Sequence, residues 1–170
     1  MLRFLQAKVG AKIPRIDKRV NHLIKFTSNY QIDDKLIGFF EESFKAIADQ
    51  LEQEHLLEKK RQPITCITLN TSTYSFEVQD DVYGIITVNA VYPTYKWRGF
   101  TDIQIYTCII EELCHFFWEI VDELEITFKV YEIVKRIKPN VKMKELYQIE
   151  WIERELKRQN KTWDDFNCKE

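Results

Sequence analysis

Apolar residues recur at intervals of three and four over much of this 170-residue chain, the spacing that is typical of amphipathic helices. A first long helix is predicted to begin at Asp33 or Asp34, which are good capping residues, and to run to about residue 60. A shorter helical pattern before it, formed by Val20, Leu23 and Ile24, predicts one helix in the N-terminal region.

A second helical region begins near residue 101, with Thr101 or Asp102 as its cap, and contains no Gly or Pro before Pro139. It is either one very long helix or two helices that meet near residues 121–123. A last helix is predicted from about residue 143 to 159, and Thr162 is expected to cap a short turn over residues 163–166.

Between these helical regions the apolar period shortens. Three runs, at residues 64–69, 74–78 and 82–91, are rich in β-branched and aromatic residues or alternate between apolar and polar positions. They predict three strands. We therefore expect an α+β fold with a small, about three-stranded and mainly antiparallel sheet, with helices packed on it.

The length fits a single domain, residues 1–170, because single cores usually stop growing well above this size. Residues 1–31 form a basic N-terminal arm with seven basic side chains and one acidic side chain. Such an arm either is solvated or contacts an acidic surface, of a partner or of its own domain. Its aromatic residues are not interleaved with its basic residues as in a single-strand binder, and the chain carries a net charge of −2, so a nucleic-acid partner is not expected.

No apolar run reaches the roughly 18 residues of a membrane span, and the N-terminus lacks the features of a signal peptide. These features predict a cytoplasmic protein without a membrane partner. The four cysteines show no Cys-x-x-Cys spacing, which favours free thiols over a structural zinc cluster. The sequence leaves the oligomeric state open.

The chemistry-bearing residues gather on one predicted helix face. When residues 102–124 are placed on a helix, a stripe of acidic residues and one imidazole lies opposite the apolar face. The stripe contains Glu111, Glu112, His115, Glu119, Asp122 and Glu123.

This stripe has two interpretations. It is either the solvated face of an amphipathic helix, or a site where Glu111 and His115, four residues apart, share a metal ion. In the second interpretation Glu112 stands beside a bound water as general base. A cation also relieves the repulsion between close carboxylates.

Residues 111–115, Glu-Glu-Leu-Cys-His, flanked by apolar residues, resemble the active-site helix of zincin-type metallopeptidases, which carries His-Glu-x-x-His. The order of a small sheet, this helix and a following acidic run is also similar over residues 35–137. The resemblance implies that Glu112 is the catalytic glutamate and that His115 is a ligand, with Glu111 in place of the first histidine. Two carboxylates and one imidazole favour manganese or iron over zinc, so each of the three ions is considered.

The third ligand implied by the resemblance is an acid from the following helix, with Glu123 preferred and Asp122 second. On an unbroken helix His115 and Asp122 lie about 10 Å apart along the axis, too far for one ion. The site therefore requires a break after about Trp118, or a ligand from elsewhere, and no glycine marks such a break.

These observations leave two functions open. The first is a zincin-like metallohydrolase, a peptidase on peptide or protein substrates, either active or degenerate. The second is a non-catalytic interaction or regulatory protein on the same scaffold. Its partner would bind the basic arm, the acidic stripe or the loop with Tyr92, Tyr95 and Trp97.

Overall fold

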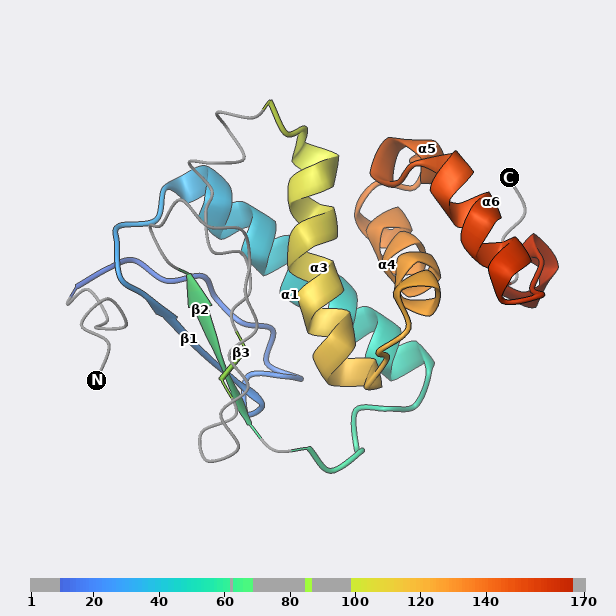
Figure 1. The fold of residues 1–170 in the computed structure, drawn as a ribbon. Helices are drawn as coiled ribbons and strands as arrows, with labels where there is room; N and C mark the ends of the chain where they lie inside the picture. Colours follow the sequence, from blue (N-terminus) through green and yellow to red (C-terminus); the bar gives the residue numbers. More distant parts are fainter. Residues whose placement is uncertain (1–9, 62, 69–84, 87–98, 167–170) are drawn as a thin grey trace. The chain divides into compact units, whose positions relative to one another are not determined.

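The computed structural model describes residues 10–61, 63–68, 85–86 and 99–166. The chain divides into two compact units, unit 1 (residues 1–100) and unit 2 (residues 101–170). Each unit has its own arrangement of elements, drawn in Figure 1. The single domain expected from the length stays a prediction.

Unit 1 contains a parallel β-α-β arrangement. Strand β1 (Ile24–Ser28) leads into helix α1 (Asp34–Gln53), which returns the chain to strand β2 (Ile64–Thr68). β2 also pairs in parallel with the short strand β3 (Ile85–Ile86), in the order β1-β2-β3. Parallel neighbours need a long crossover connection, and α1 provides it between the first two strands.

The expected α+β fold with a mainly antiparallel sheet is wrong. The described residues are mostly helical, and their short paired strands run parallel. Ile24 belongs to β1, so the predicted N-terminal helix is also wrong. The run at 74–78 lies outside the described residues, as does the loop with Tyr92, Tyr95 and Trp97. The spacing of apolar residues identified the segments of β2 and β3 as extended but not that of β1, and the direction in which strands pair depends on partners far away in the sequence.

The core of unit 1 lies between β1 and α1. β1 alternates buried and exposed residues, as a strand with one covered face should. Its Phe26 contacts Phe40 and Phe44 of α1, with ring centroids 4.9 and 6.4 Å apart. Asp33 caps α1 by accepting from the backbone N–H of Leu36, so the first of the two predicted capping residues is confirmed.

The described part of the basic arm contacts acidic residues of its own unit. Lys12 pairs with Asp34, and the backbone N–H of Arg15 donates to Glu41. The Arg19 guanidinium contacts Asp17, Asp49 and Glu52. Of the interpretations left open for the arm, these contacts favour an acidic surface of its own unit.

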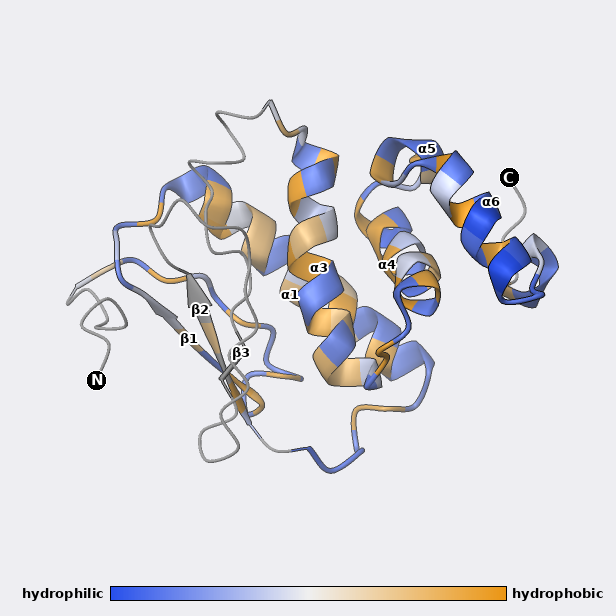
Figure 2. Ribbon diagram, in the orientation of Figure 1, coloured by the Kyte–Doolittle hydropathy of each residue, from blue (hydrophilic) through white to orange (hydrophobic). Residues whose placement is uncertain are grey.

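Unit 2 is helical in its described residues. Helix α3 (Asp102–Trp118) packs against α4 (Glu123–Ile137) and α5 (Met143–Leu146), and α4 packs against α6 (Ile149–Arg158). A 3₁₀ turn, η2 (Trp163–Phe166), follows, with both the N–H and the hydroxyl of Thr162 bonded to Asp165. Figure 2 shows that α3 is largely apolar, whereas α6 is largely hydrophilic.

The predicted final helix at 143–159 is interrupted. α5 ends at Leu146, and Tyr147 and Gln148 are extended before α6 begins. Residues of α4, α5 and α6 enclose a second apolar core, made of Leu124, Phe128, Met143, Ile152 and Leu156. Among the described residues, no helix combines the length and apolar character needed to cross a bilayer, and the compartment stays a prediction.

Candidate metal centre

The helix that carries Glu111 and His115 ends at Trp118. The next residue, Glu119, is left-handed with φ of 57°, a conformation that costs a non-glycine residue roughly 1–2 kcal/mol. The next helix, α4, begins at Glu123, with Asp122 as its cap. Of the two arrangements left open by the sequence, the pair of helices that meet near residues 121–123 is therefore the one observed.

The turn at Glu119 brings three ligand-type side chains together. Glu111, His115 and Glu123 each offer one ligand atom, and these atoms lie within 4.8 Å of one another. On an unbroken helix His115 and Glu123 would be about 12 Å apart along the axis. Ligand atoms around one ion are separated by about 3.4 Å in a tetrahedral shell, so these atoms would have to approach each other by up to about 1.4 Å to share one ion.

A backbone contact orients His115. Its Nδ1 lies 2.8 Å from the carbonyl oxygen of Ile120, which comes directly after the left-handed residue. Because a carbonyl only accepts, this hydrogen bond requires a proton on Nδ1, and in the neutral ring Nε2 then keeps its lone pair. Metal-binding histidines are commonly oriented by such a bond from the other ring nitrogen.

The carboxylates of the cluster repel each other. Burial, and next the negative charge of Glu123, raise the pKa of Glu111, while the bond from Tyr147 and the charge of His115 lower it. Within the part of the chain that the structure describes, neither Glu111 nor Glu123 forms an ion pair with a Lys or Arg. A bound cation would offset the repulsion that raises the pKa of Glu111.

Asp122, the second candidate for the third ligand, has a different role. Its carboxylate accepts from the backbone N–H of Glu125 and from the side-chain amide of Gln159, each at 2.9 Å. The bond from Glu125 is the main reason why the pKa of Asp122 is lowered. The structure thus brings Glu123 into the cluster and uses Asp122 to cap α4.

Glu112, the predicted general base, is half-buried on α3, one position after Glu111. It does not belong to the cluster of three ligand atoms. Its assignment therefore still rests on the motif. Cys114 is buried among the apolar residues of α3, as expected for a structural thiol.

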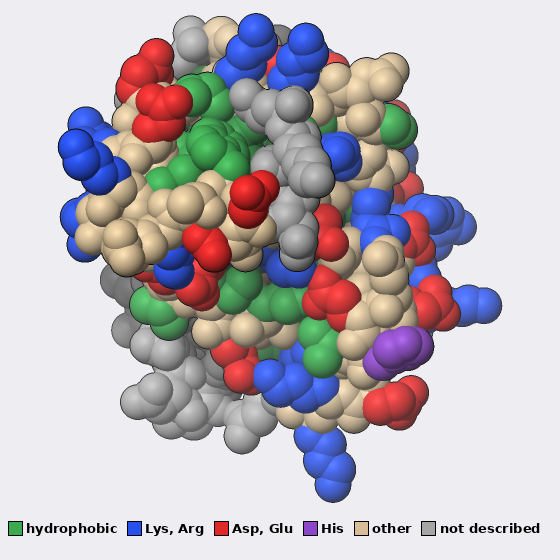
Figure 3. Space-filling view, turned by 90° about the vertical axis from the view of Figure 1, so that its right-hand side faces the viewer, with side chains coloured by type: hydrophobic (Ala, Val, Ile, Leu, Met, Phe, Trp, Pro, Cys, Tyr) green, Lys and Arg blue, Asp and Glu red, His purple; other side chains and the backbone are tan. Residues whose placement is uncertain are grey.

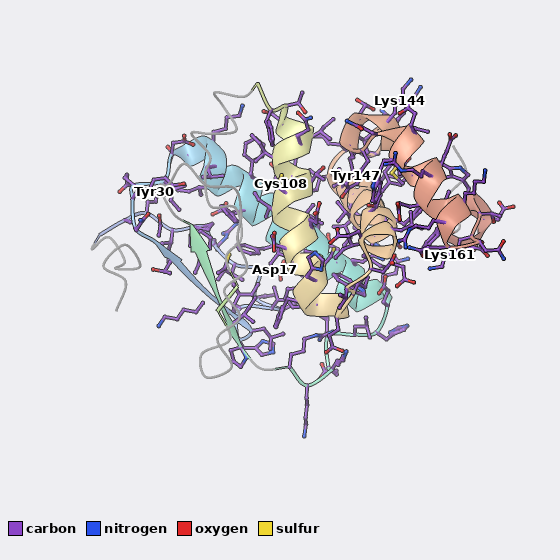
Figure 4. All side chains as sticks on the ribbon, viewed as in Figure 1. Asp17, Tyr30, Cys108, Lys144, Tyr147 and Lys161 are labelled. Atoms are coloured by element: carbon purple, nitrogen blue, oxygen red, sulfur yellow. The ribbon has the colours of Figure 1, made fainter. Side chains whose placement is uncertain are left out.

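A pocket of about 240 Å³ opens beside the cluster. Its lining residues are Glu111, Glu123, Thr127, Tyr147, Gln148 and Trp151. The Tyr147 hydroxyl donates to Oε2 of Glu111 at 3.3 Å, and Figure 4 labels Tyr147 between α3 and α5. Burial raises the pKa of this hydroxyl well above its usual range, so it remains a donor.

The sequence did not indicate that Tyr147, Gln148 and Trp151 reach this pocket. Their segment was predicted as continuous helix, and no Gly or Pro marks the interruption at Tyr147. Figure 3, viewed from the side of α5 and α6, shows acidic and basic side chains around an apolar patch at the upper left and smaller apolar patches below it.

Comparisons with protein-family models, curated proteins and solved structures found no match. The resemblance to zincin-type metallopeptidases therefore stays a prediction, carried by residues 111–115.

Proposed function

We propose that unit 2 binds a divalent metal ion through Glu111, His115 and Glu123 and acts as a metal-dependent hydrolase on a peptide substrate. The observation that supports this proposal is the convergence of three ligand atoms from two helices within 4.8 Å. Convergence of this kind is not expected of a solvated helix stripe, whose side chains point away from each other.

The chemistry of the donors fits a metal. Two carboxylates and one imidazole are ligands for manganese, iron or zinc, and the oxygen majority favours manganese or iron. The bond from His115 to the Ile120 carbonyl supplies the orientation that a metal-binding imidazole needs. The pocket beside Glu111 and Glu123 offers room for part of a substrate.

Each residue then has a stated task. A bound divalent ion supplies Lewis acidity toward a carbonyl oxygen and lowers the pKa of a water molecule. Glu112, by its position in the motif, accepts the proton of the attacking water and returns it to the leaving amine. Glu111, His115 and Glu123 hold the ion, and the pocket walls orient the peptide.

Elemental analysis of protein purified without chelator or affinity metal tests this proposal. Near-stoichiometric manganese, iron or zinc is expected in the wild type, and His115→Ala should lose it. Glu123→Ala should lose it as well. Asp122→Asn is the matched control, because asparagine keeps an oxygen that caps α4 and only the neighbouring charge is removed.

Equal metal loss in Asp122→Asn and Glu123→Ala would remove the assignment of Glu123. Wild-type protein that stays metal-free after incubation with each ion would overturn the proposal. The alternative, a non-catalytic interaction protein, would then account for the chain, and its partner would have to be sought directly.

A further inference from the structure

Tyr147 reaches the candidate metal centre because the chain is extended between two short helices. Its backbone has φ of −134° and ψ of 159°, and its N–H closes α5 by donating to the Met143 carbonyl. α5 packs against α3, so the side chain that leaves the end of α5 is near the ligand-bearing helix. In a continuous helix from 143 to 159, the helical period would set the direction of the side chain at position 147 instead.

The ring of Tyr147 is fixed by packing. It lies against the apolar core of Leu124, Phe128, Met143, Ile152 and Leu156. A side chain held by a core in this way presents its polar end at a fixed place. The hydroxyl is therefore a preorganised donor.

The acceptor of this donor is one oxygen of Glu111. The hydroxyl lies 3.3 Å from Oε2. Glu111 is a half-buried side chain on α3, and a carboxylate has two oxygens that are equivalent when free. A bond to one of them removes rotational freedom and distinguishes the two oxygens.

We infer that Tyr147 is a positioning residue for the metal centre: its hydroxyl holds one oxygen of Glu111 and leaves the other directed to the ion. This inference rests on the proposed function of Glu111 as a ligand. It adds a residue from a third segment of unit 2 that neither the motif nor its spacing indicates. Groups that orient ligands typically change metal affinity by about 10- to 100-fold when removed.

Titration with Co²⁺, followed by visible absorption, tests the inference. Tyr147→Phe keeps the ring and deletes only the hydroxyl, and it is expected to weaken Co²⁺ binding by about 10- to 100-fold. The absorption band of the bound Co²⁺ should also change, because the carboxylate is then free to bind in another orientation. Because phenylalanine keeps the ring in the core, a changed band reports the lost hydroxyl rather than lost packing.

Tyr131→Phe is the matched control. Tyr131 packs on the same core, but its hydroxyl lies 3.4 Å from the Val141 carbonyl oxygen rather than near Glu111. Its variant should bind Co²⁺ as the wild type does. Circular dichroism of both variants checks that each remains folded.

A second background separates action through Glu111 from a general effect on the fold. In Glu111→Gln protein, whose residual Co²⁺ binding is measured at high ion concentration, adding Tyr147→Phe should change the affinity by less than about twofold. The same loss in both backgrounds would overturn the inference.

The failures of the two proposals are distinguishable. Wild type that binds none of Co²⁺, Mn²⁺ and Zn²⁺ removes the proposed function and the inference with it. Wild type that binds Co²⁺, with a Tyr147→Phe variant of equal affinity and identical absorption, overturns the inference alone and leaves the metal centre standing.

Discussion

Each unit of this protein contains a cluster of carboxylates, and the two clusters are neutralised differently. In unit 1 the Arg19 guanidinium lies 2.7–2.8 Å from carboxylate oxygens of Asp17, Asp49 and Glu52. In unit 2, Glu111 and Glu123 are near His115, and among the described residues no Lys or Arg pairs with either of them.

This difference explains why the pKa is lowered in a carboxyl group of the first cluster and raised in one of the second. The bond from Arg19 is the main cause that lowers the pKa of Asp17 to about 2. Burial and the charge of Glu123 raise the pKa of Glu111. A cluster that contains its own cation stabilises the fold, whereas a cluster of uncompensated carboxylates is a candidate for binding an external cation.

The largest expected effect concerns the general base beside the second cluster. Glu112→Gln should lower the rate of peptide hydrolysis by at least about 100-fold, because it removes the proton acceptor while leaving all three ligands. Metal content should stay that of the wild type, as measured by elemental analysis. Glu150→Gln, at an exposed position of α6, is the control. An unchanged rate in a metal-loaded Glu112→Gln protein would remove the assigned role.

The next largest effect is expected when the cation of the unit 1 cluster, Arg19, is removed by substitution. Arg19→Met should lower the free energy of unfolding by about 2 kcal/mol at pH 7, less than for a fully buried pair because the side chains keep about a fifth of their exposure. Lys12→Met, which removes an exposed pair with Asp34, should cost at most about 0.5 kcal/mol. Urea unfolding measures both.

The stability difference between the wild type and Arg19→Met is expected to depend on pH in one direction. The pKa of Asp17 is lower in the folded protein, so the stability from this pair is complete above the unfolded pKa near 4 and is lost as the pH falls toward 2. The difference between wild type and variant should therefore shrink over that interval. A difference that is constant from pH 7 to 2 would show that Asp17 is not its source.

The smallest expected effect is an increase in the free energy of unfolding. Glu111→Gln should make the metal-free protein more stable at pH 7, by less than about 1 kcal/mol, because glutamine still accepts from Tyr147 but carries no charge. The folded pKa of Glu111 is raised, so its contribution to stability is present below the unfolded pKa of about 4.5 and is lost as the pH rises through the folded value. Thermal unfolding of chelator-treated protein measures the gain, and a loss of stability at pH 7 would contradict the repulsion between Glu111 and Glu123.

Local patterns predicted the helices better than the sheet. The capping of α1 by Asp33 and of α3 by Thr101 follows from short-range hydrogen bonds that the sequence reveals. The segment around Ile24 was misassigned because three apolar residues at helical spacing also fit a turn followed by a strand. Its pairing with β2, forty residues later, makes it extended.

The sequence by itself determined the residue types of the candidate centre and the placement of Glu111 and His115 one turn apart on a helix. The tertiary structure decided which acid joins them, through the left-handed Glu119 and the cap at Asp122, and it added Tyr147 from the interrupted C-terminal helix. The reason is physical. A helix fixes neighbours within a turn by its own geometry, whereas a chain reversal without Gly or Pro is stabilised by contacts between segments that are distant in the sequence.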